Sequence, residues 1–236
     1  MTLLIAAALV FLGIHLLIAG TTVRDAITGA IGEGPYLGLF SLASLGAIVW
    51  LAMAYGAAHV SAGNPILFHA PQFVRDLAIP VILVAFLIGI PGLMTPNPTS
   101  VGQAAAASKE ETVRGILRVT RHPFLWGVAL WALFHLSANG DLASTIFFGA
   151  FLALSILGTF SIDAKRRRKM GDAWSAFANR TSNVPFGAIA AGRNSFALGE
   201  YLDWRFLTAV AIFMAVLFAH ARVFGASPFP GGWVPL

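Results

Sequence analysis

The chain has 236 residues, of which 58% are hydrophobic and 11% are charged, with a mean hydropathy of +0.79. A soluble domain carries roughly 25% charged residues, so this composition excludes an ordinary soluble domain and indicates an integral membrane protein. The net charge of +5 reflects few acids and clustered basic loops, so no nucleic-acid partner is expected, and the absence of cysteine excludes disulfides and thiolate metal ligands.

Six apolar runs predict the membrane helices. They are Thr2–Gly20, Tyr36–Ala58, Leu77–Met94, Phe124–Ala138, Leu142–Ile162 and Phe206–Phe224. A helix needs about 20 residues to cross the hydrocarbon core. Five runs are long enough, and the fourth must extend back through Pro123 towards Thr112. The sequence therefore predicts an all-α, polytopic membrane protein with about six transmembrane helices, in one domain over residues 1–236.

Charge predicts the orientation of these helices. The first run has no basic residue before Arg24, so it is interpreted as a retained helix rather than a signal peptide. With six helices, 13 of the 15 basic residues fall in the loops after the first, third and fifth, including the basic segment 163–205. Basic loops stay in the cytoplasm. We therefore expect a bacterial inner (cytoplasmic) membrane protein with both termini on the non-cytoplasmic side.

The polar connections are expected to differ in character. Thr21–Pro35 is short and turn-rich, and His59–Asp76 contains Gly-Asn-Pro and Ala-Pro turn signals that predict an irregular loop. Ser108 with Glu111 three residues later forms a capping-box pattern, which marks a helix start. That helix is expected to run into the fourth membrane helix, kinked or restarted at Pro123.

Histidines within the apolar runs are the first candidates for chemistry, because an ionisable side chain inside a membrane is costly. His15 lies in the first run without a polar neighbour, and His135 is four residues before Asn139, on the same helical face. A hydrogen bond to a backbone carbonyl would also account for either histidine. His122 lies thirteen residues before His135, which is about 19 Å of helical rise, so these two cannot share one iron.

The chain resembles the NnrU family, which includes the 15-cis-zeta-carotene isomerases. The matching motifs are Arg121-His122-Pro123, the Trp131-x-x-x-His135 run, Asn139-Gly140-Asp141, Gly171-Asp172-x-Trp174 and Thr181-Ser182-x-Val184-Pro185. The resemblance covers nearly the whole chain and is weakest over residues 59–108.

The resemblance implies a haem b site. The isomerases of the family are haem b proteins, and the resemblance assigns the two iron ligands to His15 and His135. Neutral imidazole is a suitable haem ligand, and ligands on facing helices are how bundles build cofactor sites. The expected depths of these two histidines differ by ~10 Å, however, so His59 or His220 is an alternative partner for His135.

The expected cofactor-binding set comprises five residues. They are His15, His135, His122, Arg121 and Asn139. Some isomerases of the family carry a cysteine in the helix of the second ligand, where this chain has Ala132. Ligand exchange that involves a thiolate is therefore excluded.

A second resemblance is to the isoprenylcysteine carboxyl methyltransferases, in which an Arg-His-Pro motif helps to hold S-adenosylmethionine. Under this alternative, a polar pocket forms from Arg121, His122, Asp163 and Arg166 against Asn179 and Arg180. The run Lys165–Lys169 departs from the methyltransferase pattern. It is interpreted as an anchor to anionic membrane lipids, worth about 1 kcal/mol per charge.

Three functions are consistent with these residues. The first is haem-dependent cis–trans isomerisation of a long polyene, a lipid-soluble substrate in the bilayer, for which Phe124, Trp126, Trp131 and Phe134 offer aromatic walls. The second is a non-catalytic haem protein that supports nitrogen-oxide metabolism. The third is an S-adenosylmethionine-dependent lipid methyltransferase.

Overall fold

All regular secondary structure in the described part of the chain is helical, as the sequence predicts. The computed structural model describes residues 1–100, 103 and 112–229. In chain order its elements are α1 (Thr2–Gly13), the π-helix η1 (Ile14–Ile18), α2 (Thr22–Ile31), α3 (Glu33–His59), α4 (Gln72–Asp76), α5 (Ala78–Met94), α6 (Ile116–Val119), α7 (Pro123–Ala138), α8 (Leu142–Met170), α9 (Asp172–Arg180), α10 (Gly187–Ala190), α11 (Leu198–Tyr201) and α12 (Trp204–Phe224). The predicted capping box at Ser108 and Glu111 lies outside the described residues.

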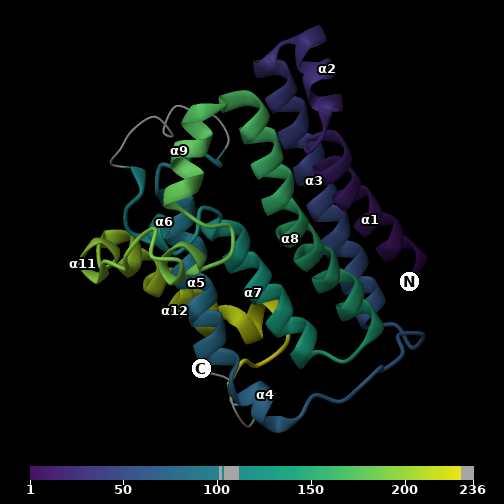
Figure 1. Ribbon diagram of the computed structural model, residues 1–236. Coiled ribbons are helices and arrows are strands. Elements are labelled where there is room, and N and C mark those ends of the chain that lie inside the picture. Colours follow the sequence, from purple (N-terminus) through teal and green to yellow (C-terminus); the bar gives the residue numbers. More distant parts are fainter. Residues whose placement is uncertain (101–102, 104–111, 230–236) are drawn as a thin grey trace.

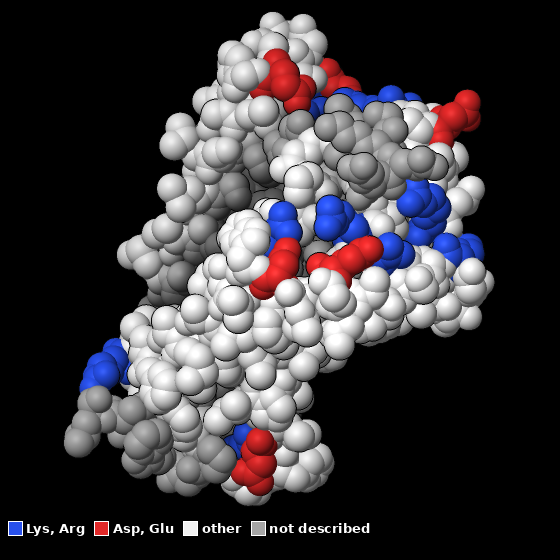
Figure 2. Space-filling view, turned by 90° about the vertical axis from the view of Figure 1, so that its left-hand side faces the viewer, with Lys and Arg blue, Asp and Glu red and all other residues white. Residues whose placement is uncertain are grey.

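Three helices, α3, α8 and α12, are long and apolar enough to cross a membrane, which supports an integral membrane protein. The stretch Thr2–Ile18 together with α2 is a fourth candidate span, bent by 76° at the break between them. The helices α5 and α7 are apolar but shorter, with 17 and 16 residues. Figure 2 shows most of the charged side chains of this face in its upper half, above a broad surface that carries few charged side chains. The prediction of an all-α membrane protein is therefore confirmed, whereas the prediction of about six spans is not.

Residues 22–31 form the helix α2, and the prediction of a turn-rich loop over Thr21–Pro35 was wrong. The hydroxyl of Thr21 accepts a hydrogen bond from the Val23 amide at 3.2 Å and starts α2 as its N-cap. Gly32, with a φ of 87°, ends this helix, and α3 begins directly at Glu33. The turn residues of this segment therefore act as helix caps.

The helix predicted as the fourth membrane span does not extend back towards Thr112. The chain is extended at Thr120, with a φ of −157°, and α7 begins at Pro123. Proline disfavours a helical conformation in the residue before it but is well suited to the first helical position. The preceding turn, α6, is therefore a separate element.

The loop after the fifth predicted helix was expected to begin at Asp163, but that helix ends only at Met170. Helix α8 continues through the basic run to Met170, because lysine and arginine are good helix formers. Gly171, with a φ of 53°, ends it. Between α3 and α5, by contrast, the predicted irregular loop is confirmed apart from the five-residue α4.

The long helices pack in two groups (Figure 1). In the first group α1, α3 and α8 share a core of alanine and leucine side chains and Phe11. In the second group α5 packs between α7 and α12, and α7 also packs against α8, which joins the two groups. The elements α6, α9, α10 and α11 lie around one end of the bundle (Figure 1). We call this end the basic end, because it carries Arg118, Arg121, Arg180 and the run Lys165–Lys169.

Helices α5 and α7 approach closely because glycines face each other. A Cβ on Gly127 would lie 2.6 Å from the Gly89 Cα atom, and one on Gly92 would lie 2.7 Å from the Phe124 nitrogen. Small residues at membrane-helix interfaces allow this backbone contact. The contact places the start of α7 beside the end of α5, where the candidate site lies.

The Asn139-Gly140-Asp141 motif forms the turn between α7 and α8 at the other end of the bundle. A Cβ on Gly140 would overlap the Phe68 carbonyl, so the loop before α4 can pack on this turn only if the residue is glycine. Asp141 caps α8 by accepting a hydrogen bond from the Ser144 amide at 3.0 Å and accepts another from Asn64 at 2.8 Å. Burial acts to raise the pKa of Asp141, but these hydrogen bonds outweigh it and lower the pKa to about 2. The motif has a structural role here.

Candidate functional site

Asp163 on α8 is the centre of a buried polar cluster at the basic end. Nε of Arg121 lies 3.0 Å from each oxygen of this carboxylate, and a second guanidinium nitrogen also donates to it. His122 Nε2 lies 2.7 Å from Asp163 Oδ1. Asn183 donates from Nδ2 at 3.3 Å. One carboxylate thus holds both polar residues of the Arg-His-Pro motif.

Backbone hydrogen bonds fix the position of this motif. The Arg121 amide donates to the Ser182 carbonyl at 2.9 Å. The Arg121 carbonyl accepts from Asn97 Nδ2 and from Thr99 Oγ1, each at 3.0 Å. The turn after α5, the segment before α7 and the segment after α9 therefore converge on one residue.

The cluster carries no net charge when His122 is neutral. Burial lowers the pKa of His122 below its ordinary value, and this outweighs the opposing effect of Asp163. The positive charge of Arg121 is matched by the Asp163 carboxylate. Because a carboxylate only accepts hydrogen bonds, Nε2 of neutral His122 carries the proton and Nδ1 is left as an acceptor.

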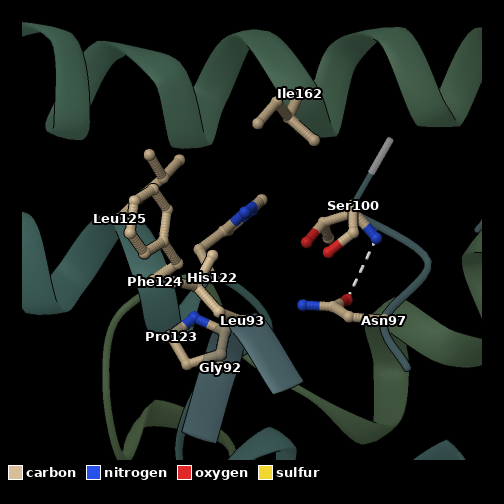
Figure 3. A pocket seen from close by; sticks show the side chains of 10 residues that line it. Gly92, Leu93, Asn97, Ser100, His122, Pro123, Phe124, Leu125 and Ile162 are labelled. Atoms are coloured by element: carbon tan, nitrogen blue, oxygen red, sulfur yellow. Dashed lines mark hydrogen bonds between the residues drawn. The ribbon is translucent and has the colours of Figure 1, made fainter. Parts of the chain in front are cut away.

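A pocket of about 250 Å³ adjoins the cluster. It is lined by Gly92, Leu93, Asn97, Thr99, Ser100, His122, Pro123, Phe124, Leu125 and Ile162. In Figure 3 the His122 imidazole lies between Ser100 and Leu125, below Ile162 of α8. Leu93 and Phe124 are 58% and 42% exposed, so the pocket borders the apolar outer surface of the bundle.

The structure brings together three of the residues expected in a polar pocket: Arg121, His122 and Asp163. Arg166 lies at its edge and donates to the Ser100 carbonyl. Asn183, rather than the expected Asn179, completes the cluster.

Two residues that build this cluster were not identified from the sequence. Asn183 occupies the unspecified position x of the Thr-Ser-x-Val-Pro motif. Its place within a family motif was the signal in the sequence that could have identified it. Asn97 belongs to an Asn-Pro turn, in which its side chain also accepts a hydrogen bond from the Thr99 amide at 3.0 Å. Such a turn residue gives no sign from sequence alone of which distant carbonyl its amide will reach.

His15 lies in the π-helix η1 and has both ring nitrogens occupied. Nδ1 lies 2.7 Å from the Phe11 carbonyl, and Nε2 lies 3.0 Å from the Ser44 hydroxyl on α3. The Phe40 ring contacts the imidazole edge-on, at 5.4 Å between centroids. An iron bound at Nε2 would replace the Ser44 hydrogen bond.

His135 is held in an aromatic environment near the end of α7. Its Nδ1 lies 2.8 Å from the Trp131 carbonyl, and its ring stacks on Phe148 at 4.6 Å. Nε2 has no hydrogen-bond partner among the described residues. The Asn139 side chain donates to the His135 carbonyl at 2.8 Å, so it caps α7 in this structure. A backbone carbonyl that orients one ring nitrogen and leaves the other free is the usual arrangement of a metal-ligating histidine.

The two histidines expected to bind one iron are not brought together. Phe11 contacts both His15 and Phe151, at 4.8 Å and 5.1 Å, and Trp131 contacts both Phe151 and His135, at 5.4 Å and 5.0 Å. A chain of three contacting rings, Phe11, Phe151 and Trp131, therefore connects the two imidazoles. His135 lies level with Phe148 on α8, whereas His15 lies one turn beyond Phe11, which corresponds to about 10 Å along the helices. The donor chemistry fits haem, but this pair does not face one iron in this arrangement.

Of the two alternative partners, His59 lies close to the level of His135. His59 lies 3.4 Å from Asp141 Oδ1, and the Tyr55 ring contacts both His59 and Phe148. On α12, His220 Nδ1 lies 2.7 Å from the Ala226 carbonyl oxygen. Within the described ranges, no three histidine or acidic side chains form a metal-binding group.

Helical architecture, apolar surface and polar clusters at both ends of the bundle together define an integral membrane protein of the all-α class.

The chain belongs to the NnrU protein family, whose sequence profile matches residues 3–228. It is 29% identical over 116 residues to the chloroplastic 15-cis-zeta-carotene isomerase of Arabidopsis thaliana, covering 48% of this chain and 32% of that protein. The Zea mays isomerase is 31% identical over 109 residues, covering 45% and 30%. The matches thus span about a third of the length of these relatives. No solved structure matches the chain.

Proposed function

We propose that this protein is a cis–trans isomerase of a long polyene dissolved in the bilayer, and that His135 binds haem b as an axial ligand. The similarity to two 15-cis-zeta-carotene isomerases over about half of the chain supports the reaction. The arrangement of His135 carries the proposal for the site. Its Nδ1 is held by the Trp131 carbonyl, and its Nε2 is without a partner among the described residues.

The residues around His135 suit an apolar, unsaturated substrate. Trp131, Phe134 and Phe148 surround the imidazole with ring centroids at 4.6–5.9 Å. Aromatic faces bind a polyene by apolar and stacking contacts without requiring a polar group on it. Haem, when bound, would supply an iron that exchanges electron density with the double bond and lowers its rotation barrier. The hydrogen bond from Nδ1 to the Trp131 carbonyl would fix the ring orientation and the tautomer.

His15 is the proposed second ligand by resemblance, with His59 and His220 as alternatives. For His15 to reach the same iron, the difference in level of about 10 Å along the helices must be closed. The haem spectrum of single variants distinguishes these choices, because each loss of an axial ligand shifts or removes the Soret band.

The test uses the full-length protein purified in detergent and supplemented with haem b. We expect a Soret band, conversion of a cis-polyene to the trans isomer as resolved by chromatography, and loss of both in His135→Ala. His69→Ala, in the exposed loop before α4, is the matched control and should retain both. Wild-type protein without a Soret band after supplementation would contradict the proposal. Haem without conversion would favour a non-catalytic haem protein that supports nitrogen-oxide metabolism, and calorimetric binding of S-adenosylmethionine would favour a methyltransferase.

We also propose that the basic end faces the cytoplasm of a bacterial inner membrane and that the N-terminus lies on the opposite side. Positively charged loops are retained in the cytoplasm, which supports this orientation. A reporter active only in the cytoplasm should be inactive when fused before Met1 and active when inserted after Gly192 in the segment that follows α10. The reverse pattern would overturn the orientation.

A further inference from the structure

We propose that the pocket beside His122 binds the hydroxyl-bearing ring of a lipid-soluble molecule of the quinol class, with its apolar tail extending into the bilayer. This site is separate from the surroundings of His135. It does not depend on the isomerase reaction.

The size of the pocket fits one ring rather than a whole cofactor. Pockets for drug-sized ligands have roughly 300–1,000 Å³, whereas a dry cavity of about 150 Å³ is enough for benzene. At about 250 Å³, this pocket has room for a single substituted ring. The rest of a longer molecule must lie outside it.

The lining of the pocket places that remainder in the membrane. Leu93 near the end of α5 and Phe124 at the start of α7 both line the pocket and are exposed on the bundle surface. Leu125 and Ile162 supply further apolar walls. A molecule seated there passes between the apolar side chains of Leu93 and Phe124, so its tail enters lipid rather than water.

The polar groups of the pocket require a hydrogen-bond donor on the ligand. His122 donates from Nε2 to Asp163, so its Nδ1, which has no partner among the described residues, accepts. Asn97 and Thr99 are already engaged with the Arg121 carbonyl. Ser100 is the second polar side chain beside the His122 ring (Figure 3). A ring hydroxyl satisfies Nδ1, whereas an ether or a hydrocarbon leaves it unpaired.

Electrostatics disfavours charged ligands at the same place. The Asp163 carboxylate is neutralised by Arg121 and hydrogen-bonded by His122 and Asn183, so it offers no free charge to a cationic ligand such as S-adenosylmethionine. The Arg121 guanidinium is likewise engaged and does not line the pocket. A neutral ring with a hydroxyl group is the ligand that matches this balance.

Binding is tested with a decyl-substituted benzoquinol, labelled with tritium and kept reduced under anaerobic conditions. The full-length protein is placed in phosphatidylcholine nanodiscs, and retention is compared with that in empty nanodiscs. We expect saturable binding at one site per protein. The dimethyl ether of the same quinol lacks the donor and should bind about tenfold more weakly, the loss expected for one unpaired buried acceptor.

Two substitutions on α8 locate the site without altering the Arg121–His122–Asp163 cluster. Ile162→Trp fills the pocket and should weaken quinol binding at least about tenfold. Leu157→Trp places the same side chain at a position that is 51% exposed, and it should bind the quinol as the wild type does. Absence of saturable binding, equal binding of the ether, or wild-type affinity in Ile162→Trp would each overturn the proposal. Loss of haem or isomerase activity would leave these binding results unchanged, so the two proposals fail separately.

Discussion

Nε2 of His122 lies 2.7 Å from Oδ1 of Asp163, and Arg121, the preceding residue, holds both oxygens of the same carboxylate. Two neighbouring residues before α7 are thereby fastened to α8 across more than forty positions of sequence. Their side chains are almost fully buried, with 1% of His122 and 13% of Arg121 exposed. The Arg-His-Pro motif therefore joins helices, and His122 and Pro123 also line a pocket.

Asp163→Asn is expected to be the most destabilising conservative change in this cluster. It leaves the Arg121 guanidinium buried without an opposite charge, and breaking a buried pair in this way costs about 3–5 kcal/mol. The melting temperature in detergent should fall clearly. Asp172→Asn, on the exposed first turn of α9, is the control and should cost at most about 1 kcal/mol. Equal melting temperatures for the two variants would show that the ion pair is unimportant for the fold.

His122→Ala should be milder than Asp163→Asn, because it removes a neutral partner and leaves Arg121 paired. We expect a loss of about 1–3 kcal/mol in the free energy of unfolding. The haem spectrum should be nearly unchanged, since His122 is far along α7 from His135. A variant that keeps its melting temperature but loses all turnover would contradict a structural role for His122.

Gly127→Ala tests the close contact between α5 and α7. The added methyl group meets the Gly89 Cα atom at 2.6 Å and the Ala85 carbonyl oxygen at 2.8 Å, which are backbone atoms that cannot rotate away. Overpacking of this kind costs about 1–3 kcal/mol. Gly149→Ala on α8 is the matched control, because its Cβ meets no atom within 4 Å. It should be neutral or slightly stabilising, so similar melting temperatures for both variants would refute the contact.

Periodic and compositional signals predicted the all-α membrane class, most of the apolar helices and the residues Arg121, His122 and Asp163. These features depend on local sequence. The continuation of α8 through its basic run and the helix α2 were missed, because polar residues that suit loops also suit the ends of membrane helices. The relative depths of His15 and His135 depend on how α1, α7 and α8 are staggered. That stagger is set by packing contacts such as Phe11 with Phe151, which no local pattern encodes.

Glu200 on α11 and Arg118 on α6 should make the contact between these two helices sensitive to acid. Arg118 holds the carboxylate through Nε and a second nitrogen at 2.7 Å and 2.8 Å, and the Gly115 amide donates to it at 2.8 Å. The hydrogen bond from Arg118 lowers the pKa of Glu200 to about 2, from 4.5. A depressed pKa means that this contact stabilises the fold fully above pH 4.5 and is lost as the pH falls towards 2. As the pH falls through this window, the Gly115 amide of the wild type should therefore lose protection against hydrogen exchange. The comparison is Glu200→Gln, whose side chain does not titrate and whose protection should stay constant. Identical pH profiles of exchange in the two proteins would show that the Glu200 carboxylate does not hold the Gly115 amide.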